Sequence, residues 1–193
     1  MTKLVILDRD GVINVNSKHY IRSPDEWSPI PGALEAIACL TRAGWNIVVA
    51  TNQAGIAKRV FSEDMLGLIH SKMLTAVRAV GGEIQRVIYC PHHPDDLCVC
   101  RKPYPGMLLA ACESFGAQPS EVAFIGDSLR DLQAAEAAGC QPVLVLSGNG
   151  CETLSHGGLP LGVRVFEDLM HFALELTLEL KRKENEDNIP YKE

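Results

Sequence analysis

The sequence lacks a long hydrophobic run. Although 47% of its 193 residues are hydrophobic, no run approaches the ~18 consecutive apolar residues that a membrane-spanning helix requires. Near the N-terminus, the apolar run Leu4–Leu7 is interrupted by Asp8, Arg9 and Asp10 before the apolar centre of a secretory signal has formed. The sequence therefore predicts no membrane anchor and a cytoplasmic location.

The sequence also lacks an excess of positive charge. It contains 18 Lys and Arg residues against 24 Asp and Glu residues, which gives a formal net charge of −6, and it has no sustained basic run. Proteins that bind nucleic acid need clustered Lys and Arg side chains to displace counterions from the phosphates. The composition therefore opposes a nucleic-acid partner, and we expect any phosphate binding to be confined to a local site.

No internal repeat or low-complexity linker divides the chain. Its length is typical of one globular domain, and a charged segment without an apolar face begins near Lys181. We therefore expect a single domain over residues 1–180 and a charged, disordered tail over residues 181–193. The expected oligomeric state is a monomer.

Short apolar runs alternate with segments of helical spacing. The expected strands are residues 4–7, 47–50, 87–89, 122–125 and 142–146, and the expected helices are residues 32–41, 62–80, 105–115 and 129–138. This alternation predicts an α/β fold, a Rossmann-like parallel sheet with helices on both faces. Ligands of such sheets bind at the carboxyl ends of the strands, so the residues that follow each run are candidates for function.

Acidic residues follow two of the expected strands. Asp8 and Asp10 come directly after the first strand, where Gly11 permits a sharp turn, and Asp127 follows the fourth. Carboxylates that are brought together repel one another unless a cation lies between them, and oxygen ligands at a phosphate site favour Mg²⁺. An isolated Asp-x-Asp pair is also typical of a turn cap, so the other motifs must decide between the two interpretations.

Thr51 and Lys102 supply groups that suit phosphate oxygens, a hydroxyl and a point charge. In the order Asp8-Arg9-Asp10-Gly11, Thr51, Lys102 and Gly126-Asp127 with Asp131 four residues on, the chain resembles the haloacid dehalogenase-like hydrolase superfamily over residues 4–148. The resemblance implies an aspartyl-phosphate mechanism with Asp8 as nucleophile and Asp10 as acid and base. Thr51 and Lys102 would hold the phosphoryl group, and Mg²⁺ would be bound by the Asp8 side chain, the Asp10 carbonyl and Asp127. For Asp131 three alternatives remain: orienting Lys102, facing solvent or binding metal.

Four metal-binding residues gather in the segment 90–100. Cys90, His92, Cys98 and Cys100 supply the sulfur and nitrogen ligands of a closed tetrahedral zinc site, with His93 as an alternative to His92. Because no position is left open, a structural Zn²⁺ is expected, and this grouping argues against a disulfide framework. A zinc ribbon that binds nucleic acid or protein is the competing interpretation, and the acidic charge opposes it.

Arg101 and Lys102 follow the last cysteine directly. A loop held by metal would aim both side chains at the strand ends, and a guanidinium at Arg101 suits recognition of a phosphate or a pair of hydroxyls. An ordinary surface arginine is the alternative. We accordingly include Arg101 among the catalytic and substrate-binding candidates.

Within the superfamily, the Asp-Arg-Asp-Gly, Thr-Asn-Gln and Cys-Pro-His…Cys-x-Cys-Arg-Lys-Pro segments are similar to a branch with the same zinc loop. It comprises heptose-bisphosphate 7-phosphatases, which act in nucleotide-activated heptose synthesis for lipopolysaccharide core, and histidinol-phosphate phosphatases. The resemblance favours the first and keeps the second as the alternative. No segment fits a large cap domain, so substrate recognition is expected from loops, with Asn16, His19, Tyr20, Asn52 and Gln53 as candidates; turn formation is the other interpretation of the first three.

Overall fold

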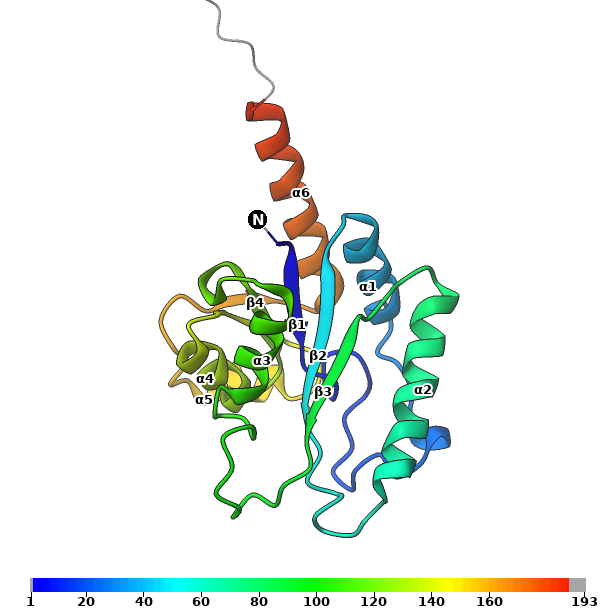
Figure 1. Cartoon of the computed structure of the whole chain (residues 1–193). Coiled ribbons are helices and arrows are strands. Elements are labelled where there is room, and N and C mark those ends of the chain that lie inside the picture. Colours follow the sequence, from blue (N-terminus) through cyan, green and yellow to red (C-terminus); the bar gives the residue numbers. More distant parts are fainter. Residues whose placement is uncertain (1, 188–193) are drawn as a thin grey trace, which may run out of the picture.

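The computed structural model of the chain describes residues 2–187 and contains a central parallel sheet (Figure 1). Every neighbouring pair of strands is parallel. In the order β3-β2-β1-β4-β5-β6, the strands are Arg86–Cys90, Asn46–Asn52, Leu4–Leu7, Ala123–Gly126, Gln141–Val145 and Arg164–Phe166. The predicted Rossmann-like parallel sheet is confirmed.

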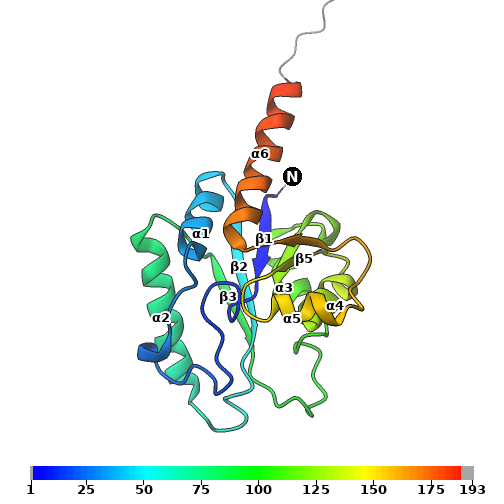
Figure 2. The same ribbon diagram turned by 180° about the vertical axis from the view of Figure 1, so that it is seen from behind.

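Helices cover both faces of this sheet (Figures 1 and 2). On one face, α1 (Ala33–Arg42), α2 (Glu63–Ala79) and α6 (Leu169–Asp187) pack on a core that includes Val5 and Leu7. On the other face, α3 (Gly106–Phe115) and α4 (Leu129–Ala138) pack on a core that includes Leu4 and Ile6. Because successive side chains of a strand point to opposite faces, the fully apolar β1 serves both cores.

The remaining elements are short. A helix α5 (Gly150–His156) follows β5, and the 3-10 turns Pro24–Glu26 and Pro119–Glu121 lie in connections. Neither α5 nor β6 was predicted, because seven and three residues are too few for a periodic pattern.

Helix α6 runs to Asp187, beyond residue 181 where the tail was expected to begin. Residues 188–193 of that expected tail lie outside the described residues.

The register of the central strands sets the position of the site. Leu7 of β1 lies opposite Val49 of β2 and Ile125 of β4. Asp8 therefore leaves β1 close to Gly126, the last residue of β4, and alongside the last residues of β2, which continues to Asn52. The Asp8 amide donates to the Ile125 carbonyl over 2.8 Å. Across the next pair, Thr51 and Asn52 of β2 lie opposite Tyr89 and Cys90 of β3. Parallel pairing thus brings residues distant in sequence to one edge.

Within residues 2–187, no helix is both long and apolar enough to cross a membrane. Nor does a separate folded module interrupt the connections that follow β1 and β2 among these residues, as expected for a site without a large cap.

Candidate active site

Lys102 lies between two aspartates at the carboxyl edge of the sheet. Its Nζ is 2.9 Å from Asp8 Oδ1 and 2.7 Å from Asp131 Oδ1, and it donates to the Ala50 carbonyl over 3.0 Å. The buried position lowers the pKa of Lys102, but the charges of Asp131 and Asp8 outweigh this and raise it. Lys102 is therefore a fixed ammonium next to the predicted nucleophile.

Three carboxylates crowd around this ammonium. Asp8, Asp127 and Asp131 each offer an oxygen, and these atoms all lie within 4.8 Å of one another. The pKa of Asp8 is raised to about 8, and burial is the largest cause. The charge of Lys102 lowers this pKa, and the charges of Asp131, Asp127 and Asp10 raise it. Burial and then Asp131 raise the pKa of Asp127 to about 6, although Asn149 and Lys102 act in the opposite direction. The single positive charge of Lys102 does not balance the negative charges of three buried carboxylates.

This set of ligands fits Mg²⁺. Its atoms are carboxylate oxygens that lie close enough together to bind one cation. Burial first, and then the neighbouring carboxylates, raise the pKa values of Asp8 and Asp127, and a divalent cation would offset this cost of buried negative charge. Asp131 is already engaged, because one oxygen accepts from the Ser128 amide over 3.0 Å and the other pairs with Lys102. Asp131 therefore faces Lys102 and not solvent, which leaves Asp8 and Asp127 as the side chains better placed to hold the cation.

Two glycines let the backbone approach Asp127 closely. Gly11 has φ +85° and Gly148 has φ +59°, and a Cβ atom at either position would collide with the Asp127 carboxylate. At the same oxygen that these glycines approach, the Asn149 amide and side chain donate to Asp127 Oδ2 over 2.8 and 2.9 Å. The carboxylate is thus held in one orientation by the loop after β5.

Asp10 points into a separate set of donors. Arg9 donates to it from Nε and Nη2 over 2.9 to 3.1 Å, Asn14 donates over 2.9 Å and Gln53 over 3.1 Å. Burial raises the pKa of Asp10, but the charge of Arg9 and these hydrogen bonds more than compensate and hold it below its ordinary value. The Asp10 carboxyl is therefore ionised.

Thr51 and Asn52 of β2, with Gln53 directly after the strand, connect these groups. The buried Thr51 hydroxyl accepts from Gln53 Nε2 over 2.9 Å, and the same nitrogen donates to Asp10. Asn52 binds the backbone of Lys102 in both directions, donating to its carbonyl and accepting from its amide, each over 3.1 Å. Asn52 and Gln53, predicted as substrate ligands, thus also orient Lys102 and Asp10.

An open cleft of about 250 Å³ lies over this edge. The five predicted catalytic residues and Asp127 line it, as do Asn16, Tyr20, Asn52 and Gln53. His19, the remaining predicted ligand, is exposed and lies outside this lining. Arg101 Nη1 is buried in the cleft wall and has no hydrogen-bond partner among the described residues. It is therefore a donor available to a ligand in this cleft.

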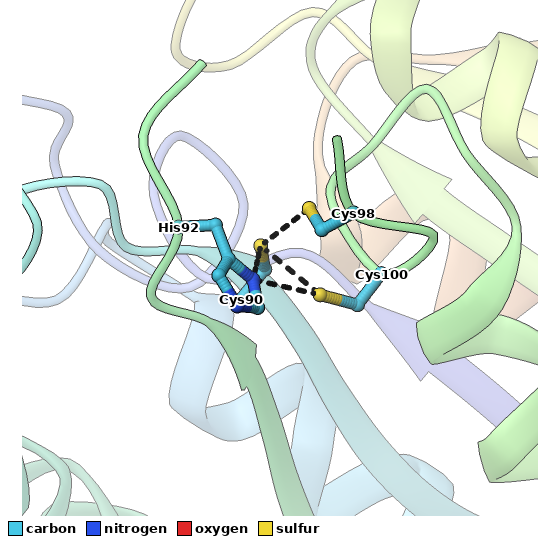
Figure 3. Close-up of side chains that lie close together, drawn as sticks. All are labelled: Cys90, His92, Cys98 and Cys100. Carbon is cyan, nitrogen blue, oxygen red and sulfur yellow. Dashed lines mark hydrogen bonds between the residues drawn. The ribbon is translucent and has the colours of Figure 1, made fainter. Parts of the chain in front are cut away.

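The four cysteine and histidine residues predicted to bind zinc meet in one cluster (Figure 3). Cys90 Sγ lies 3.5 Å from His92 Nδ1, 3.8 Å from Cys98 Sγ and 3.3 Å from Cys100 Sγ, and His92 Nδ1 lies 3.2 Å from Cys100 Sγ. Ligands of a tetrahedral zinc ion are roughly 3.5–3.8 Å apart, given its usual bond lengths. The cluster therefore fits Zn²⁺.

His93 takes no part in this cluster. Its Nδ1 lies 3.2 Å from Asp95 Oδ2, and its backbone amide donates to Asp96 Oδ2 over 2.7 Å. The cluster begins at Cys90, which pairs with Asn52, and ends two residues before Lys102. The loop that carries the Cys and His cluster is therefore joined to the carboxyl edge of the sheet through Asn52 at one end and Lys102 at the other.

Sequence reasoning missed four residues that shape the site: Arg9, Asn14, His70 and Asn149. Arg9 lies inside the Asp-Arg-Asp-Gly motif, and Asn149 follows β5, so its place at a strand end was a usable signal. Asn14 and His70 carried none. His70 comes from the middle of α2, where its spacing is that of an ordinary core position.

Known proteins resemble this chain over most of its length. A D-glycero-beta-D-manno-heptose-1,7-bisphosphate 7-phosphatase of Bordetella bronchiseptica is 51% identical over 177 residues, covering 92% of this chain and 99% of the relative. One from Pseudomonas aeruginosa is 50% identical over 173 residues, covering 90% and 97%. The crystal structure of the B. bronchiseptica D,D-heptose 1,7-bisphosphate phosphatase, complexed with magnesium and phosphate, superposes with a TM-score of 0.91 over 92% of this chain and 99% of that one.

The family model of haloacid dehalogenase-like hydrolases matches residues 2–139, which include β1, β2, the loop of residues 90–100 and β4. The chain belongs to the haloacid dehalogenase-like hydrolase family.

Proposed function

We propose that the protein removes the 7-phosphate of D-glycero-D-manno-heptose 1,7-bisphosphate through an aspartyl-phosphate intermediate. The observation that carries the chemistry is the Lys102 ammonium held 2.9 Å from Asp8 beside two further carboxylates that suit a divalent cation. The substrate is supported by relatives of that name at 51% and 50% identity. Heptose activation for lipopolysaccharide is the corresponding biosynthetic role.

In the first step, Asp8 attacks phosphorus, and the bond from phosphorus to the sugar oxygen breaks. Lys102 and Thr51 bind the phosphoryl oxygens, and Asp10 gives a proton to the departing oxygen. Mg²⁺ held by Asp8, Asp127 and the Asp10 carbonyl would offset the negative charge on the phosphoryl group.

In the second step, a water molecule attacks the phosphorus of the aspartyl phosphate, and the Asp8 carboxylate is released. Asp10 accepts the proton of this water. Arg9, Asn14 and Gln53 all donate to Asp10, which stabilises the ionised form that a general base requires. For the first step Asp10 must carry a proton, so its environment favours the base half of the cycle.

The cysteine cluster supports a structural Zn²⁺. All four of its ligand positions are filled by the protein, so no position is open for substrate or water. A bound Zn²⁺ would fix the loop that ends at Arg101 and Lys102.

Arg101 distinguishes the two substrates considered. The free donor of Arg101 suits the distal phosphate of a bisphosphate, with Lys58 or Arg59 in the loop after β2 as further cations. The ammonium of histidinol phosphate would be repelled by the same charge. Histidinol phosphate is therefore the weaker candidate.

The test is a comparison of kcat/KM for heptose 1,7-bisphosphate and histidinol phosphate, with Mg²⁺ present and with Mg²⁺ chelated. We expect Mg²⁺-dependent turnover, a preference for the bisphosphate and release of the 7-phosphate alone. A higher kcat/KM for histidinol phosphate would overturn the substrate while leaving the phosphatase in place. Turnover that survives chelation would overturn the role of Mg²⁺.

A further inference from the structure

A buried histidine lies behind the Asp10 site. His70 comes from the middle of α2 and is 8% exposed. The other buried residues of this helix are apolar: Leu66, Ile69, Met73 and Val77. A polar ring on such a face is unfavourable unless it is hydrogen-bonded, so its partner matters.

The partner is Arg9. Arg9 Nη1 lies 3.2 Å from His70 Nε2, and because a guanidinium can only donate, Nε2 accepts and the ring proton sits on Nδ1. Burial, then the Arg9 charge, lower the pKa of His70 to about 4, against a smaller opposing effect of Asp10. The ring is thus neutral and able to accept.

The Arg9 guanidinium is shared between two neighbours. Its side chain is 1% exposed; Nε and Nη2 form a fork on Asp10, and Nη1 reaches His70. The guanidinium is planar and rigid, so fixing Nη1 at one end fixes the direction of the fork at the other. On its far side, the His70 ring lies 6.0 Å from the Tyr89 ring, measured between centroids.

We propose that His70 is a positioning residue for Asp10: by accepting from Arg9 Nη1, it sets the plane of the guanidinium that holds the Asp10 carboxylate for proton transfer. The inference rests on the acid and base role of Asp10 in the proposed function. His70 is not among the residues that line the cleft, and its side chain reaches Asp10 through Arg9.

The experiment compares two substrates that differ mainly in the leaving group. Phenyl phosphate has a poor leaving group, so its departing oxygen must be protonated by a general acid. 4-Nitrophenyl phosphate has a good leaving group and depends less on that proton. The parameter kcat/KM reports the steps up to release of the first product, here the phenol. A residue that acts through the general acid Asp10 therefore changes the ratio of kcat/KM for phenyl phosphate to kcat/KM for 4-nitrophenyl phosphate. A residue that serves stability alone changes both equally.

The variants are His70→Leu, which removes the acceptor, and the pair His70→Gln and His70→Asn. A Gln side chain reaches the place of Nε2, and an Asn side chain is one carbon too short. We expect His70→Leu and His70→Asn to lower kcat/KM roughly tenfold for phenyl phosphate, a fraction of the ~10²–10⁴-fold that general acid catalysis supplies. For 4-nitrophenyl phosphate the loss should stay below about threefold, and His70→Gln should be close to the unmodified protein on both.

Met73→Leu, a volume-conserving change on the same buried face of α2, is the matched control and should leave the ratio unchanged. If His70→Leu fails to fold, the Gln and Asn pair decides, because both keep a polar side chain. Equal losses on both substrates, or no difference between Gln and Asn, would overturn the inference.

Asp10→Asn separates this inference from the proposed function. It should change the ratio more than His70→Leu does, and in its background His70→Leu should change the ratio no further. No change of ratio in Asp10→Asn would overturn the acid role of Asp10 and the inference with it. A changed ratio in Asp10→Asn with an unchanged ratio in every His70 variant would overturn the inference alone.

Discussion

Lys102 Nζ and Asp131 Oδ1 form an ion pair of 2.7 Å in which each side chain is 1% exposed. The same ammonium contacts Asp8, so Asp131 fixes the cation that faces the proposed nucleophile. Asp131 in turn is held by Ser128, with which it forms a capping box at the start of α4. The start of this helix therefore determines where the positive charge of the site lies.

Asp131→Asn should lower both stability and activity. Removing one partner of a buried ion pair typically costs 3–5 kcal/mol, and we expect about 3 kcal/mol because Asp8 still faces Lys102. Urea unfolding gives the stability, and kcat gives the catalytic effect. The control is Glu136→Gln, an exposed carboxylate on the same helix. An Asp131→Asn protein as stable as this control would contradict the importance of the pair.

Asp8→Asn should abolish turnover without unfolding the protein. The change removes the nucleophilic carboxylate, keeps its volume and relieves the crowding of charges around Asp127 and Asp131. Phosphate release and circular dichroism measure the two effects. Rapidly quenched protein should show a phosphoenzyme for the unmodified chain and none for Asp8→Asn. Near-normal turnover in a folded variant would exclude the covalent mechanism.

Cys98→Ser should lower bound zinc, thermal stability and kcat together, because the loop that positions Arg101 and Lys102 loses a ligand. We expect the melting temperature to fall by roughly 5–10 °C, the range for a loss of a few kcal/mol in a chain of this size. Added Mg²⁺ should restore none of it. Cys151→Ser, at an exposed thiol outside the cluster, is the control. Protein purified without chelators that contains no zinc would refute this site.

Arg101→Ala should weaken turnover of the bisphosphate more than that of 4-nitrophenyl phosphate. A hydrogen bond to a charged group is worth about 1.5–3 kcal/mol, or roughly 10–100-fold in kcat/KM. An aryl phosphate has no distal phosphate, so it makes no such contact with Arg101 and should lose little. Arg78→Ala, at an exposed position of α2, controls for loss of net charge. Equal losses on the two substrates would place Arg101 at the reaction centre and not at the distal phosphate.

The free energy of unfolding should depend on pH through His70. Its pKa falls from 6.5 to about 4 on folding, so between these values the unfolded chain binds the proton and the folded chain does not. Stability from this group is present above pH 6.5 and is lost as pH falls toward 4, by about 3 kcal/mol in all. Arg9, Asp10 and Tyr89 are the titratable groups that face the ring.

The measurement is urea unfolding from pH 4 to pH 7 for the unmodified protein and for His70→Gln. Their difference isolates this histidine from the carboxylates that titrate in the same range. A constant difference between the two proteins would mean that the ring is protonated as easily in the folded state as in the unfolded one.

The sequence predicted the parts of the fold whose residues carry a local signal. Buried strands such as β1 are continuous apolar runs, and in a parallel sheet the polar residues after them must meet at one edge. The proximity of Asp8, Thr51 and Asp127 follows from that rule. Strand β2 runs to Asn52, past the predicted end at residue 50, because Thr51 and Asn52 are polar residues that still pair with β3.

The features of the site that could not be predicted from the sequence depend on the direction in which side chains point. Asn149 follows a strand like the other site residues, but its Ser-Gly-Asn-Gly context is typical of a plain turn. His70 lies 61 residues from Arg9, and only the packing of α2 on the sheet brings the two together. The hydrogen bonds of Asn52 and Gln53 to Lys102 and Asp10 likewise require knowledge of which way each amide points.

Because Asn149 orients Asp127, activity can appear only late in the synthesis or refolding of the chain. The site collects groups from the ends of β1, β2, β4 and β5, so the last contributor lies 141 residues after Asp8. A chain emerging from the ribosome contains the nucleophile early, yet it cannot orient the Asp127 carboxylate until residue 149 is free to fold. Turnover during refolding should therefore rise only when the loop after β5 docks, which makes enzymatic activity a marker for the placement of β5 and its loop and not for early collapse.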